Sequence, residues 1–71
     1  MIPAVNVHQV TSERPAGVHY SGRELDSARN MAFHRSRQFP GRWLVQTLQA
    51  SGEWQVRGWY ERGTWREAGD G

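Results

Sequence analysis

Histidine side chains are the residues of this chain best suited to metal binding or acid–base chemistry. The sequence holds three His and no Cys, and no two His stand in an HxH or HxxxH pair. On the helix predicted below, His34 would share a column with Asp26 and Asn30. That is a weak set of ligands, because a catalytic zinc site needs about three well-placed protein groups. We therefore expect the protein to bind no metal ion and no cofactor.

Hydroxyl and carboxyl groups form no recognisable catalytic arrangement either. A nucleophilic Ser needs a positioned His and an orienting carboxylate, and the chain contains no GxSxG sequence. Ser21 is better explained as a helix cap and Ser36 as part of a helix surface. Most of the seven acidic residues adjoin an Arg, which indicates ordinary exposed charges. A chain of 71 residues also leaves little room for a deep substrate pocket, so we expect no enzymatic activity.

Length and composition predict a single small domain over residues 1–71. A chain of this size buries only about 60% of its unfolded surface, so its core must be small. Because it lacks Cys, its stability must come from packing or oligomerisation. No stretch approaches the roughly 20 apolar residues of a membrane span, and residues 1–5 lack the features of a signal peptide. We therefore expect a soluble, cytoplasmic protein.

The charged and aromatic residues are biased in type. All nine basic residues are Arg, and the net charge is +2. Arg suits phosphate binding and stacking on aromatic rings, but a GC-rich genome explains the absence of Lys better. The charge is well below that of a strongly basic nucleic-acid-binding domain. The four Trp are the most unusual feature, since Trp is enriched in small cores and in binding hot spots.

The clearest local pattern predicts a helix over residues 22–38. Ser21 and Glu24 fit a capping box as the N-cap and third helical residue. Pro40 and Gly41 would end the helix, because Pro disfavours helix in the preceding residue and Gly suits the turn. Apolar residues recur at helical spacing at Leu25, Ala28, Met31, Ala32 and Phe39.

Strands are predicted on both sides of this helix. Residues 5–10 form a strand, residues 11–17 a polar turn or loop, and residues 18–20 either a short return strand or the lead-in to the helix. After the helix we expect a hairpin, a short last strand and a frayed tail, at residues 42–49, 53–60, 64–67 and 69–71 respectively. The order β(β)αβββ predicts an α+β fold, with one helix packed on a small antiparallel sheet of three to five strands.

The register of the hairpin decides which side chains face the helix. A two-residue turn places Trp54 on the face of Trp43, and a three-residue turn with a bulge places it on the face of Leu44. In both registers, strict alternation puts Trp54, Val56 and Tyr60 on one face and Gln55, Arg57 and Trp59 on the other. The first set is the more apolar, so we expect the helix to cover it.

The second face would then be open and would carry Arg57 and Trp59. A two-residue turn at residues 62–63 would place Arg66 opposite Trp59, where an Arg can stack on the ring. This face is either an aromatic and basic platform for a nucleic-acid base or a protein partner, or a sheet surface simply covered by Arg stems.

A second basic feature lies at the end of the predicted helix, where Arg35 and Arg37 are followed by Arg42. These cations offset the negative end of the helix dipole, or they contact phosphates or an acidic partner. The candidate partner-binding residues are therefore Arg57, Trp59, Arg66, Arg35, Arg37 and Arg42.

In general type the chain resembles small phage-encoded anti-defence proteins, including anti-CRISPR proteins. The likeness lies in its size, its lack of Cys, its single capped helix from Ser21 onward and its Trp-rich hairpin between Trp43 and Trp65. It covers the whole chain but matches no motif, so it transfers no functional residue. The resemblance implies a stoichiometric inhibitor of a host nucleoprotein complex, acting in the host cytoplasm.

Three functions remain open. The first is a protein that docks on a larger protein or nucleoprotein complex as an inhibitor or adaptor, which small size and the lack of catalytic groups favour. The second is a direct nucleic-acid-binding module that uses the same Arg and Trp residues, although the seven interspersed acids oppose it. The third is a structural homodimer formed through the open sheet face.

Overall fold

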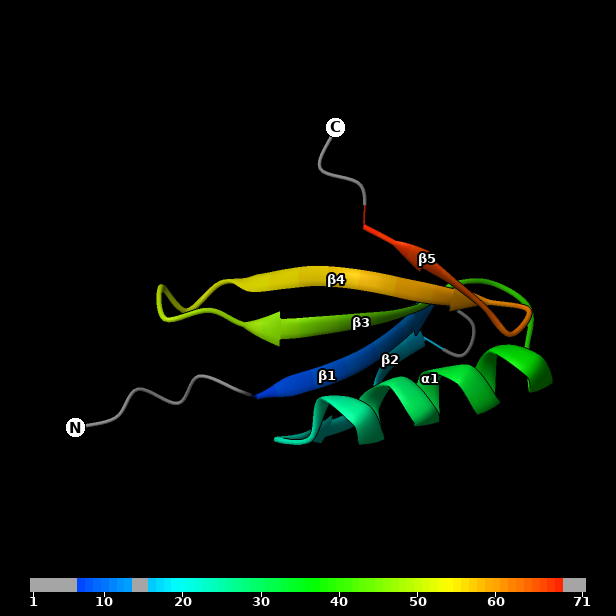
Figure 1. Ribbon diagram of the computed structural model, residues 1–71, viewed down its shortest axis with the longest axis horizontal. Helices are drawn as coiled ribbons and strands as arrows, with labels where there is room; N and C mark the ends of the chain where they lie inside the picture. Colours follow the sequence, from blue (N-terminus) through cyan, green and yellow to red (C-terminus); the bar gives the residue numbers. More distant parts are fainter. Residues whose placement is uncertain (1–6, 14–15, 69–71) are drawn as a thin grey trace.

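A five-stranded antiparallel sheet with one helix on one of its faces forms the fold (Figure 1). The computed structural model describes residues 7–13 and 16–68. The start of the strand predicted from residue 5 and the tail predicted at residues 69–71 lie outside these ranges. The elements are β1 (His8–Glu13), β2 (Ala16–Gly22), α1 (Leu25–Gln38), β3 (Trp43–Leu48), β4 (Trp54–Glu61) and β5 (Thr64–Glu67). The α+β prediction is thus confirmed, and the sheet order is β2-β1-β3-β4-β5.

The described residues of the segment predicted to be a loop, 11–13 and 16–17, belong to strands β1 and β2. Thr11 and Ser12 continue β1, because β1 is a central strand that pairs with β2 on one side and with β3 on the other. Thr11 is a good strand former, and backbone pairing on both sides overrides the weaker strand preference of Ser12. The return strand expected at residues 18–20 is confirmed as part of β2. A shift in the ladder leaves His19 as the extra residue between Val18 and Tyr20.

The start of the helix is the main local error of the sequence analysis. Ser21 and Gly22 belong to β2, and the N-cap is Glu24, which makes no side-chain capping hydrogen bond. The predicted capping box is therefore wrong, since pairing of Ser21 with Gln9 holds this segment in the sheet. The helix ends at Gln38 as predicted, with Phe39 in an extended conformation.

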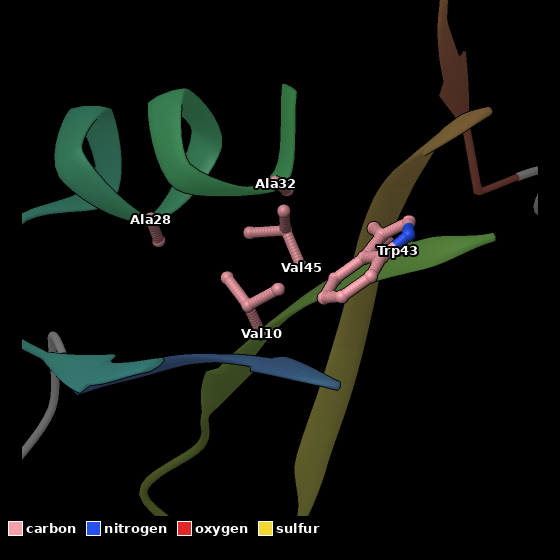
Figure 2. Packing of buried hydrophobic residues seen from close by; sticks show 5 residues of the cluster. All are labelled: Val10, Ala28, Ala32, Trp43 and Val45. Carbon is pink, nitrogen blue, oxygen red and sulfur yellow. The ribbon is translucent and has the colours of Figure 1, made fainter. Parts of the chain in front are cut away.

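The core lies between α1 and the central strands (Figure 2). Ala28 and Ala32, one turn apart on α1, are fully buried, and their small side chains let the helix lie close to the sheet. Trp43 is the largest fully buried side chain, and Val10 and Val45 complete the cluster. The helical stripe is thus confirmed at its two alanines. Leu25 and Met31 are partly buried against the cluster, whereas Phe39 lies beyond the helix and is exposed.

Ser36 is buried, contrary to its expected place on the helix surface. Its hydroxyl donates to the carbonyl of Phe33 at 2.7 Å and accepts from the backbone N–H of Gly63 at 3.0 Å. Gly63 and Arg62 form the two-residue turn between β4 and β5, and both have positive φ, as the primed hairpin turns require. Ser36 thereby ties the last turn of α1 to this hairpin.

The β3–β4 hairpin follows the three-residue alternative. The loop spans residues 50–52, closed by a bond from the N–H of Gln49 to the carbonyl of Glu53 at 2.8 Å, and Gly52 has a φ of 91°. Leu48 pairs with Trp54, so Trp54 and Val56 lie on the face of Leu44, away from α1.

A bulge then reverses the side-chain alternation along β4. Gln46 pairs with Val56 and Val45 pairs with Gly58, which leaves Arg57 as the extra residue. Beyond the bulge, Trp59 pairs with Leu44 and returns to the face of Val56. The strict alternation expected for this strand is therefore wrong, and the bulge separates Arg57 from Trp59.

Candidate binding surface on the open sheet face

The face of the sheet opposite α1, hereafter the open face, is covered by no other helix or strand of the described residues (Figure 1). The strand register assigns side chains to it from every strand. They are Gln9, Thr11, Glu13, Ala16, Val18, Ser21, Leu44, Gln46, Leu48, Trp54, Val56, Trp59, Glu61, Thr64 and Arg66.

Apolar side chains of β3 and β4 form a continuous strip on the open face. We call this the apolar strip; its members are Leu44, Leu48, Trp54, Val56 and Trp59. Leu48 lies opposite Trp54 and Leu44 opposite Trp59, so each Leu packs beside an indole across the ladder. Trp54 and Trp59 are the largest side chains of the strip, and Trp54 is 38% exposed. Contiguous apolar patches mark interaction sites, and Trp is enriched among the residues that contribute most to binding, so the strip is a candidate contact surface.

A polar cluster borders the strip on the β1 side. The amide oxygen of Gln46 accepts hydrogen bonds from Nε2 of Gln9 at 2.6 Å and from Oγ1 of Thr11 at 3.5 Å. These bonds fix the orientation of the Gln46 amide beside the strip, so the open face has an apolar half and a hydrogen-bonded polar half.

Two arginines flank Trp59. The Arg42 guanidinium carbon lies 5.4 Å from the centre of the Trp59 ring, within cation–π distance. Arg66 lies opposite Trp59 across the β4–β5 ladder, as predicted, and Tyr60 lies opposite Trp65. The half-buried Trp59 also has a buried indole Nε1 without a hydrogen-bond partner among the described residues. The Trp59 end of the apolar strip therefore has two Arg beside it, with Glu61 further along the same face.

The other three predicted partner-binding residues lie elsewhere. Arg57 leaves the bulge on the side of α1, where it lines a groove with Leu25 and Arg29, so its predicted place beside Trp59 is wrong. Arg35 and Arg37 are exposed on α1, on the far side of the sheet from the strip. A shallow depression of about 370 Å³ at this end of α1 is lined by Ser36, Arg37, Gln38, Phe39, Pro40 and Arg62.

The structure thus unites Arg42, Trp59 and Arg66, and adds Trp54 and Val56, which the sequence analysis assigned to the helix face. One feature of the sequence could have indicated that Trp54 and Val56 lie on the same face as Trp59. Gly58 stands inside an otherwise strong strand, and such a glycine often marks a bulge.

The titratable groups of the described ranges include one buried histidine and no candidate metal cluster. No cluster of three or more His, Asp or Glu there could hold a metal ion. No helix in residues 7–13 and 16–68 is long and apolar enough to cross a membrane. His8 is the only buried histidine of the described part of the chain, and its Nδ1 lies 2.9 Å from Oγ1 of Thr47.

His8 should make the stability of the protein depend on pH. Burial lowers the pKa of His8 below 6.5, and the positive charge of Arg57 lowers it further. The unfolded chain therefore gains a proton near pH 6.5 that the folded protein gains only at lower pH. The free energy of unfolding should fall as the pH drops from about 6.5 to the folded-state pKa, and then level off. Urea unfolding between about pH 7.5 and 5 measures this slope.

The matched variants for this measurement are His8→Asn and His34→Asn. The Asn amide can keep the bond to Thr47 but does not titrate, so His8→Asn should flatten the profile. His34 is exposed on α1, so its variant should keep the wild-type slope. Equal slopes in the two variants would contradict the assignment to His8.

Together these observations define a two-layer α+β domain with an aromatic, arginine-flanked sheet surface. Compared with known proteins, the chain matches no family model, no curated protein and no solved structure. Fold and surface chemistry are therefore the observations on which a function can be proposed.

Proposed function

We propose that the protein is a non-enzymatic binding protein that docks through its open face on a larger protein or nucleoprotein complex. In this role it acts as a stoichiometric inhibitor or adaptor of the anti-CRISPR type. The observation that supports this most is the apolar strip, which places two Trp and three aliphatic side chains on an open sheet face. Trp and Arg are enriched among the residues that contribute most to binding energy at protein interfaces.

Charge indicates which kind of partner surface fits. Arg42 and Arg66 flank the strip at Trp59, and Glu61, opposite Thr64 on the same face, offsets one of these two charges. A complementary partner surface would have an apolar centre bordered by Asp or Glu. The Arg rim would then raise the association rate and fix the orientation, while the buried Trp side chains would contribute most of the affinity.

Direct nucleic-acid binding is the second candidate, and the exposed Trp54 favours it, since a base can stack on a free indole. Trp59 is less available for stacking, because Arg42 already lies over its ring. This candidate predicts a steep loss of affinity with salt, as phosphate contacts release counterions. A homodimer through the apolar strip is the third candidate.

A capture experiment with paired variants tests the proposal. The open-face variant combines Trp54→Ala with Arg66→Ala. The control combines Phe39→Ala with Arg35→Ala, which removes one exposed aromatic and one exposed Arg on the helix side of the sheet. Both double variants should keep the far-UV circular dichroism of the wild type, because all four side chains are exposed.

We expect wild type and control to retain the same discrete protein from nuclease-treated bacterial lysate at moderate salt. The open-face variant should retain at least about tenfold less, equivalent to about 1.4 kcal/mol. The purified pair should then form a complex of fixed stoichiometry by light scattering. Equal capture by both variants would overturn the docking role of the open face. Loss of capture after nuclease treatment would show that the protein binds nucleic acid rather than docking on a protein. If the purified chain forms a dimer and the open-face variant abolishes it, the open face serves self-association rather than docking on a partner.

A further inference from the structure

A second concave surface lies between α1 and strands β4 and β5, on the side of the sheet away from the open face. We call it the arginine groove; it has a volume of about 360 Å³. Its lining residues are Leu25, Arg29, Arg57, Trp65 and Glu67. Two guanidinium groups and one carboxylate thus meet beside an indole ring, and the formal charge of the groove is positive.

Arg29 is held in place on the wall of the groove. Its guanidinium carbon lies 4.5 Å from the centre of the Trp65 ring. The half-buried Trp65 ring itself packs against Tyr60, with the ring centres 4.9 Å apart. The Nε of Arg29 is buried and has no hydrogen-bond partner among the described residues. A guanidinium that is already oriented and partly desolvated loses less entropy and less hydration when it binds an anion.

Arg57 reaches the groove because of the bulge in β4. As the extra residue of that bulge it leaves the open face, although strict alternation would have kept it beside Trp59. Its charge acts on the helix side of the sheet, where it disfavours protonation of His8. The bulge therefore brings a second cation to the site of Arg29, and β-bulges commonly re-aim side chains at functional sites.

Glu67 does not neutralise these two cations by direct pairing. Its Oε2 accepts a hydrogen bond of 3.4 Å from the indole Nε1 of Trp65. Within the described part of the chain, no salt bridge joins Glu67 to Arg29 or Arg57. The carboxylate therefore lowers the positive potential of the groove without occupying the hydrogen-bonding positions of the two guanidinium groups.

We propose that the arginine groove binds the oxyanion group of a small organic anion, a phosphate or a carboxylate, between Arg29 and Arg57. Guanidinium groups match both oxyanions, because their paired N–H groups donate to two oxygens at once. Leu25 and the Trp65 ring contact the apolar part of such a ligand. Glu67 weakens binding by like-charge repulsion and keeps the affinity low. This site is separate from the apolar strip and does not depend on the function proposed for the open face.

Nuclear magnetic resonance titration tests the proposal with inorganic phosphate and succinate as probes. Each probe is added at constant ionic strength, and sodium chloride serves as the control anion. The indole N–H signal of Trp65 and the Nε–H signal of Arg29 are followed. We expect both signals to shift saturably with at least one probe and not with chloride. The probe that binds more tightly identifies whether the oxyanion is a phosphate or a carboxylate.

Variants of three neighbouring charges distinguish a groove from general electrostatic attraction. Arg57→Gln should weaken binding of the probe about fivefold, and Glu67→Gln should strengthen it by a similar factor. Arg66→Gln removes the same charge as Arg57→Gln but on the open face, between the two groove residues of β5, and should change affinity less than about twofold. Equal losses in the Arg57 and Arg66 variants, no gain in the Glu67 variant, or shifts that do not saturate would each overturn the proposal.

Discussion

Replacing Trp43 with Ala should leave the protein largely unfolded under conditions in which the wild type is folded. Trp43 is fully buried and is the largest of the five buried hydrophobic side chains that form the core of the described residues. Removing a buried Trp side chain costs about 3–5 kcal/mol. A domain of 71 residues has a total stability of about 4–11 kcal/mol, so this loss removes much or all of it. Urea unfolding followed by far-UV circular dichroism measures the change.

Two control variants show whether the loss of stability comes from removing a buried side chain or from removing any aromatic ring. Trp54→Ala removes an indole that is 38% exposed on the open face, and it should cost less than about 1 kcal/mol. Trp43→Phe should cost less than Trp43→Ala, because it keeps an aromatic ring and removes a buried Nε1 that has no partner in the described residues. A loss below about 1.5 kcal/mol for Trp43→Ala would show that the core does not depend on this side chain.

Replacing Gly58 with Ala should destabilise the protein by about 3 kcal/mol. A Cβ atom at this position would lie 2.6 Å from the backbone oxygen of Arg66 and 2.7 Å from Cη2 of Trp65. The backbone oxygen belongs to the paired strand β5 and cannot move without breaking the ladder. The Trp65 ring can move only by leaving Tyr60 and Arg29. The midpoint of urea unfolding measures this loss, and the Arg29 Nε–H signal reports the displaced ring.

Gly22→Ala is the matched control for Gly58→Ala. Gly22 is also a strand glycine without a positive φ, but the atom its Cβ would approach most closely is the hydroxyl of Tyr20, at 2.6 Å. The end of a side chain can shift, so we expect a loss of about 1 kcal/mol or less. Equal losses at the two positions would show that the contact with Trp65 and β5 does not restrict residue 58.

The parts of the fold that follow from local sequence were predicted well. The turn at residues 62–63 fixed the pairing of Trp59 with Arg66, because a two-residue turn with Gly determines the register of its flanking strands. Pro40 and Gly41 ended the helix at Gln38 as expected. Helical spacing identified Ala28 and Ala32 as core residues. Each of these outcomes depends on residues within a few positions of one another.

The errors involve residues that are distant in the sequence. Ser21 fits a helix cap locally, but its backbone pairs with Gln9 in the sheet. Ser36 is buried because it accepts a hydrogen bond from Gly63, 27 residues away. The candidate site was predicted only in part, because some of its residues are placed by a local turn and others by contacts distant in the sequence. Trp59 and Arg66 were placed correctly by a local turn, whereas Arg57 was misplaced by a bulge at Gly58, where the Trp65 ring and β5 leave no room for a side chain.

The sheet order has a consequence for how the protein folds. β1, β2 and α1 form one continuous half of the chain, and β3, β4 and β5 form the other. Among the residues that the structure describes, the ladder between β1 and β3 joins the two halves in the sheet. The buried cluster spans this seam, since Val10, Ala28 and Ala32 come from the first half and Trp43 and Val45 from the second. Neither half therefore contains a complete hydrophobic core, and we infer that the two halves fold and unfold together in one cooperative transition.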